Sequence, residues 1–250
     1  DFIRVVHRTR TAGRRLNSKA DAIAEAYTVA RQTQTSFEFV ASVDADIELP
    51  ADAFERTLDH FDSNELLGVT GGLYKQLVNG TWRYGRTSPT HVPGALQVFR
   101  REVFEAIGGY RPLNAGGLDV VATAQARMLG WETGVTPELV YIHGRQTGTG
   151  GERRPIAAAY RLGVRDHSLG MSLRFQLAKC VHWARSSRMV IAMAALLGYL
   201  GAWATRRQSD VPSDVAAFIR SEQHGRLSDE LADKLGLARL SRTKTVLPNP

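Results

Sequence analysis

A short apolar segment that ends abruptly in two acids restricts the fold of this chain more than any other feature. Phe37 to Val43 is the kind of run that forms a buried parallel strand, and Asp44-Ala45-Asp46 follows it directly. Pro50 then favours the start of a helix, since proline is well tolerated in the first helical turn. The spacing predicts that three residues of this helix face inward: Phe54, Leu58 and Phe61.

The same alternation of strand and helix continues to about residue 150. Further strands are expected at 2–6, 66–70 and 139–142, and further helices from Ser18, at 101–107 and at 119–129. Asn79-Gly80 predicts a hairpin, and Gly108-Gly109 and Gly130 predict helix ends. The pattern indicates an α/β fold in which helices cover both faces of one sheet.

Beyond residue 155 the pattern becomes helical and basic, so we expect one domain at 1–150 and a helical extension at 151–250. Residues 189–205 carry no charge and are at the lower limit of length for a membrane span. Gly198 and Gly201 weaken a span, and a packed or interfacial helix is the favoured interpretation. Peripheral contact with an anionic membrane is therefore expected.

The chain is basic, with 32 Lys and Arg residues against 25 Asp and Glu and a formal net charge of +7. The basic residues cluster at 1–19 and 145–188, which suits a phosphate-bearing ligand or an anionic membrane, although any one of these arginines is more commonly just solvated. No nucleic acid partner is expected, because no RNA-binding signature or helix-turn-helix pattern accompanies the charge. The single cysteine, Cys180, excludes an internal disulfide and a thiolate zinc cluster.

Asp44 and Asp46 are the strongest candidates for a metal site. Carboxylates one residue apart at the end of a buried strand point the same way and repel each other, and a divalent cation relieves that repulsion. Hard oxygen ligands suit Mg²⁺ or Mn²⁺, and ligands of open α/β sheets bind at the carboxyl ends of strands. A turn or a helix cap would use the same two residues without a metal.

Two further residues are ambiguous when each is taken alone. Asp119 begins a predicted helix, either as its N-cap or as a general base that deprotonates an acceptor hydroxyl. His143 ends a predicted strand, either as an ordinary histidine or as a ligand of a metal or phosphate. Residues 144–151 are rich in glycine, include Arg145 and predict a mobile loop that lacks a Walker A sequence.

Taken together, the order and spacing of these residues resemble the family 2 inverting glycosyltransferases. Such enzymes have the GT-A fold, a Rossmann-like mixed sheet flanked by helices that binds nucleotide-diphospho-sugars. The resemblance covers about residues 1–150. The matching stretches are Asn17-Ser18-Lys19-Ala20, Val43-Asp44-Ala45-Asp46, Pro93-Gly94 through Phe99-Arg100-Arg101, Ile107-Gly108-Gly109-Tyr110, Leu118-Asp119 through Gly130-Trp131, and Tyr141-Ile142-His143.

The resemblance implies a role for each matched charged residue. Asp44 and Asp46, together with Lys19, would bind the donor's ribose and diphosphate. Asp46 and His143 would hold the metal, Mg²⁺ or Mn²⁺, which makes the expected activity metal-dependent. Asp119 would be the catalytic base.

The remaining implied roles concern the donor loop and the acceptor. The loop with Arg145 would close over the donor, and Gly94 and Trp131 would lie on the acceptor side. The implied reaction moves a hexosyl group from a nucleoside diphosphate donor to a saccharide or lipid-linked acceptor, with inversion (EC 2.4). The expected location is cytoplasmic, at the inner face of the cell membrane.

Two departures from the family pattern keep other interpretations open. Leu118 stands where the family has a second acid, which favours an inactive module that binds sugar nucleotides. The family's first nucleotide-binding strand would come before Asp1, so the chain is expected to lack it. A polyprenyl-phosphate sugar synthase and a sugar nucleotidyltransferase are also compatible with the α/β pattern and the acidic pair.

Overall fold

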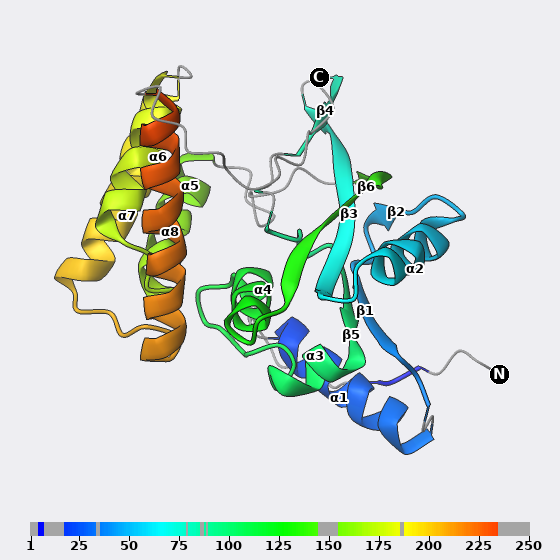
Figure 1. Ribbon diagram of the computed structural model, residues 1–250. Coiled ribbons are helices and arrows are strands. Elements are labelled where there is room, and N and C mark those ends of the chain that lie inside the picture. The colour runs from blue at the N-terminus through cyan, green and yellow to red at the C-terminus, as the bar shows by residue number, and fades with distance from the viewer. Residues whose placement is uncertain are drawn as a thin grey trace. The chain divides into compact units, whose positions relative to one another are not determined.

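A computed structural model of the chain divides it into two compact units (Figure 1). Unit 1 comprises Asp1–Tyr74 and Arg86–Ile142, and unit 2 comprises Lys75–Gly85 and His143–Pro250. The residues that the structure describes are 5–7, 18–33, 36–78, 80–85, 88, 90–144, 155–185 and 188–234.

A mixed sheet flanked by helices forms the centre of the α/β part of the chain, as the sequence predicts. Its six strands are β1 (Phe39–Val43), β2 (Ile47–Glu48), β3 (Leu67–Val78), β4 (Thr81–Tyr84), β5 (Leu96–Arg100) and β6 (Glu132–His143). They lie in the order β1-β5-β3-β6-β2, and β4 pairs with β3.

Strand β1, which carries the acidic pair at its end, does not have the predicted parallel pairing. It pairs antiparallel with β5, from Phe39 opposite Arg100 to Val43 opposite Leu96. Within the described part of the chain it is an edge strand, and Val43 is 45% exposed. The prediction of a buried parallel strand is therefore wrong, because an apolar run indicates a strand but not the direction of its partner.

Helices cover both faces of the sheet in unit 1. They are α1 (Ser18–Thr33), α2 (Ala53–Ser63), α3 (Arg101–Ala106) and α4 (Leu118–Met128). One core cluster joins α1, α3 and α4 to Phe99 of β5, and a second joins α2 to Leu96 and Val98 of the same strand. This alternation along β5 follows from the two-residue period of a strand and separates the two hydrophobic layers.

The inward face of α2 is only partly the predicted one. Phe61 is fully buried, but Phe54 and Leu58 are 48% and 40% exposed, so the prediction is wrong for these two residues. The buried positions are Ala53, Thr57 and Phe61, which lie four residues apart and share one face of the helix. Thr57 tolerates burial because its hydroxyl donates a hydrogen bond to the Ala53 carbonyl at 2.7 Å.

The predicted turns and helix ends are confirmed where they are described. Val78 and Thr81 face each other across the β3–β4 hairpin, and Gly80 has a φ of 76°, whereas Asn79 lies outside the described residues. Gly108 and Gly130 follow α3 and α4 with φ of 72° and 90°. Of the strand expected at 2–6, only Val5 and Val6 are described, and neither is in a strand.

The described residues of unit 2 form mainly the helices α5 (Pro155–Ser168), α6 (Leu173–Arg185), α7 (Met189–Ala204) and α8 (Ser213–Lys234). A buried ion pair joins two of them, since Lys179 of α6 donates to the carboxylate of Asp166 on α5. None of the helices in the described ranges is both long and apolar enough to cross a membrane.

Candidate functional site

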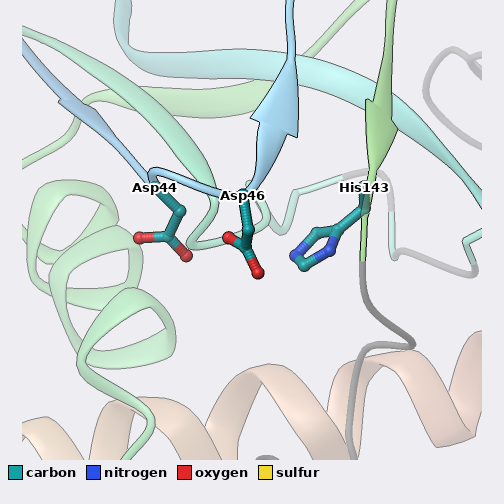
Figure 2. A group of neighbouring side chains, drawn as sticks. All are labelled: Asp44, Asp46 and His143. Atoms are coloured by element: carbon teal, nitrogen blue, oxygen red, sulfur yellow. The ribbon is translucent and has the colours of Figure 1, made fainter.

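Three potential metal ligands meet where neighbouring strands begin and end. Asp44 follows β1, Asp46 precedes β2, and His143 is the last residue of β6, the strand beside β2 (Figure 2). One ligand atom from each residue lies within 4.8 Å of the other two, and all three residues are partly buried. Two carboxylate oxygens and one imidazole nitrogen are a suitable partial ligand set for a divalent cation such as Mn²⁺.

The turn that carries the two acids is fixed by the backbone. The Asp44 amide donates to the Ala95 carbonyl at 2.9 Å, which extends the β1–β5 pairing by one step beyond the strand. Asp46 lies between Asp44 and His143 in Figure 2, and its carboxylate is directed towards the imidazole ring. The backbone of the sheet therefore brings the three side chains together at the ends of their strands.

Lys19 links helix α1 to this edge of the sheet. Its Nζ donates to Asp44 Oδ1 at 2.6 Å and to the Gly94 carbonyl at 2.7 Å. The Lys19 and Asp44 side chains are 30% and 35% exposed, so solvent weakens the attraction of the ion pair. The lysine therefore adds a fixed positive charge beside the acidic pair, where an anionic ligand would meet it.

Asp119 lies close to the same loop, from the other side of Gly94. It is in the first turn of α4, after Gly117, whose φ of 91° is in the left-handed region. A Cβ at Gly94 would lie 3.0 Å from the Asp119 Cβ and 3.1 Å from Oδ2. A larger residue at this position would require the Asp119 side chain to shift, and the Gly94 carbonyl also accepts from Lys19, so this glycine contacts both charged residues.

His91 is a residue of the site that the sequence analysis did not find. Its Nε2 lies 3.7 Å from Asp119 Oδ2, with the two side chains 30% and 25% exposed. This distance allows an ion pair with Asp119 only when His91 is protonated. The sequence around His91 has no metal-ligand spacing or other pattern that would single it out, and only the fold brings it to Asp119.

Two buried tyrosines lie within reach of the charges of the site. Burial raises the pKa of Tyr110 and of Tyr141 well above the usual range, and the charges of Asp119 and Asp44 raise both pKa values further. Tyr110 donates to Gln97 Oε1 at 2.6 Å, whereas the Tyr141 hydroxyl has no hydrogen-bond partner in the described part of the chain. Both therefore remain neutral phenols, Tyr110 in the first core cluster and Tyr141 in the second.

Trp131 and Leu118, two other positions named from the sequence, contribute to the core. Trp131 follows the C-terminal end of α4, opposite to the end that carries Asp119, and packs against the first core cluster beside Gly68. Leu118 packs against the same cluster, so this position contributes to the core. Arg145 lies outside the described residues.

No protein-family model matches the chain, and a search of curated proteins finds no match. Among solved structures, the chain is similar to the mannosyltransferase PcManGT from Pyrobaculum calidifontis in complex with GDP-Man and Mn²⁺, with 18% identity and a TM-score of 0.45 over 93% of this chain. It is also similar to GalNAc-T7 with UDP, GalNAc and Mn²⁺, with 16% identity and a TM-score of 0.37 over 56% of this chain. The chain spans 65% and 34% of the lengths of those two chains.

Proposed function

We propose that this chain is a metal-dependent glycosyltransferase of the GT-A type, which moves a sugar from a nucleoside diphosphate donor to an acceptor with inversion. The main support is the convergence of Asp44, Asp46 and His143 to within 4.8 Å of one another. Lys19 contacts Asp44, and Asp119 lies against the same loop at Gly94, so a cation site and a carboxylate base would share one edge of the sheet. The motif resemblance to family 2 glycosyltransferases supports the same assignment.

Each residue of the site has a distinct task in this reaction. Asp44, Asp46 and His143 would hold Mn²⁺ or Mg²⁺, and the bound ion would supply positive charge to the departing diphosphate. Lys19 adds a second positive charge on the donor side.

Asp119 takes the proton from an acceptor hydroxyl while the hydroxyl oxygen attacks the anomeric carbon. The new glycosidic bond forms as the bond from that carbon to the diphosphate oxygen breaks, and the diphosphate leaves with the electron pair. Attack on the face opposite the leaving group inverts the anomeric centre. The acceptor in this proposal is a saccharide or a lipid-linked saccharide.

Nucleotide binding tests the metal and donor site directly. We expect isothermal titration to show that UDP or GDP binds in the presence of Mn²⁺ and that Asp46→Ala abolishes the metal-dependent part, because one of three ligands is lost. Asp59→Ala is the matched control, since Asp59 is an exposed aspartate of α2 outside the cluster. Binding of neither nucleotide under any metal condition, or equal binding by Asp46→Ala, would contradict the proposal.

A further inference from the structure

Helix α7 turns its small residues inward and its large apolar residues to solvent. The buried residues are mainly small: Ala192, Ala194, Ala195, Gly198, Tyr199 and Ala202. The large residues on the other side form the α7 apolar face: Val190 (61% exposed), Met193 (57%), Leu197 (59%), Leu200 (36%) and Trp203 (68%). A helix on the surface of a globular domain normally has the reverse arrangement, with polar residues on its outer face.

The packing of α7 against α5 explains why only small residues face inward. A Cβ at Gly163 of α5 would lie 1.9 Å from the Ala195 carbonyl oxygen, and a Cβ at Gly198 would lie 2.0 Å from the Tyr160 carbonyl oxygen. The two backbones therefore approach through a glycine on each helix, an arrangement that is common between helices in membranes. The large side chains of α7 are left on the outer side.

Charges at both ends of α7 complement an anionic surface. Between Asp166 and Asp210 the sequence contains no acidic residue. The Lys and Arg residues of this stretch are Arg174, Lys179, Arg185, Arg188, Arg206 and Arg207. Arg185 and Arg188 precede α7, and Arg206 and Arg207 follow it. If the helix lay flat on a bilayer, both pairs would therefore be near the lipid phosphates.

We propose that the α7 apolar face lies in the interfacial layer of an anionic lipid bilayer, with the helix axis along the membrane surface. The apolar side chains would enter the boundary between head groups and acyl chains, while the flanking arginines would bind lipid phosphates. This inference does not depend on the proposed transferase activity. A second copy of the chain is a poorer occupant, because an antiparallel twofold pairing of α7 would place Arg185 and Arg188 of one copy near Arg206 and Arg207 of the other.

Flotation of the full chain with lipid vesicles tests the proposal. We expect the chain to float with phosphatidylglycerol vesicles at low salt and to bind phosphatidylcholine vesicles far more weakly. Leu197→Glu should weaken binding by about tenfold or more, since it replaces a buried leucine at the membrane by a charge. Leu129→Glu is the matched control: Leu129 is 53% exposed in unit 1, and the substitution changes the net charge equally.

Two further measurements test whether lipid, and not another ligand, covers the α7 apolar face. Anionic vesicles should shift tryptophan emission to the blue, and Trp203→Phe should remove most of that shift. Arg185→Gln should weaken binding more than Arg111→Gln, which removes one charge from unit 1. Circular dichroism and thermal unfolding of Leu197→Glu establish that it is folded.

Three results would overturn the inference. The wild-type chain could fail to bind anionic vesicles at low salt, or folded Leu197→Glu could bind them as the wild type does. Sedimentation could also show a wild-type dimer that Leu197→Glu dissociates while vesicles are not bound, which would assign the face to a second copy. None of these results bears on nucleotide binding, so each is distinguishable from failure of the transferase proposal.

Discussion

Asp119 lies in the first turn of α4 and is not the N-cap residue of that helix. The N-cap position belongs to Gly117, the loop at Gly94 lies against the Asp119 side chain, and His91 Nε2 lies 3.7 Å from Asp119 Oδ2. The Asp119 side chain is 25% exposed, so solvent reaches it only in part. The residue that precedes it, Leu118, is part of the core and leaves Asp119 as the single acid in this turn of the helix.

Replacing Asp119 by asparagine should separate catalysis from donor binding. We expect Asp119→Asn to lower kcat by about 10²–10⁴-fold, because the amide cannot accept the proton of a hydroxyl acceptor. Metal-dependent nucleotide binding should stay within about twofold, since Asp119 is not a metal ligand in this assignment. Steady-state transfer assays and titration calorimetry measure the two effects, with Asp59→Asn as the control.

Two other outcomes would be informative for this variant. An unchanged kcat with a phosphate acceptor would indicate that no base is needed, since a phosphate is already ionised. Loss of nucleotide binding together with activity would contradict the assigned role of Asp119 and place it on the donor side.

At the scale of elements, a polar contact fixes α2 on the sheet. His60 Nδ1 of α2 lies 2.9 Å from Thr136 Oγ1 of β6, and Thr136 Oγ1 lies 3.1 Å from Thr70 Oγ1 of β3. Burial lowers the pKa of His60 below 6.5, and the charge of Glu138 opposes this effect only in part. Burial beneath α2 thus favours the neutral imidazole in the folded chain.

The lowered pKa of His60 makes stability depend on pH in a defined direction. Below pH 6.5 the unfolded chain binds a proton more readily than the folded chain, so acid favours unfolding. The free energy of unfolding should rise with pH up to about 6.5 and then level off, with a contribution of at most about 1.4 kcal/mol per pH unit.

Urea unfolding at several pH values measures this contribution as the difference between the wild type and His60→Gln. The variant should show a weaker pH dependence, whereas His224→Gln, which removes an exposed histidine of α8, should retain the wild-type slope. Parallel curves for the wild type and His60→Gln would contradict the assignment.

The close contact between α5 and α7 leads to a second prediction, which concerns the stability of unit 2. Gly163→Ala should destabilise unit 2 by about 1–3 kcal/mol, because the new methyl group would overlap the Ala195 carbonyl and force the helices apart. Gly225→Ala in α8 is the control: a Cβ there meets nothing within 4 Å, and alanine should stabilise the helix by up to about 1 kcal/mol. Denaturant unfolding measures both, and equal effects of the two variants would contradict close packing.

At the scale of the whole molecule, the sequence predicts the fold class better than it predicts which strands pair with each other. The strand–helix alternation predicts an α/β fold, and glycines correctly mark the ends of α3 and α4. The sequence does not predict that β1 pairs antiparallel with β5, because hydrophobic pattern carries no information on strand partners. It also gives no sign that the β3–β4 hairpin belongs with the later helices, since that assignment depends on contacts distant in sequence.

The candidate site likewise combines residues that local sequence patterns indicate with residues that only the fold brings there. Asp44, Asp46 and His143 were singled out from residue type and position at strand ends, and the structure brings them together. Local patterns sufficed there because strand ends of one sheet meet at its edges. His91 and the distant position of Trp131 could not be foreseen, since both depend on how loops fold back onto α4.

The links made by Lys19 also have a consequence for the growing chain on the ribosome. The lysine and its acceptor at Gly94 are 75 positions apart, and His143 is made later still. At a synthesis rate of about 5–20 residues per second, Lys19 waits about 4–15 s for Gly94 to be made. The two aspartates are made within that interval, and their histidine is still missing when Gly94 has been made. We therefore expect the complete cation site to form only after His143 has been made and the sheet is complete.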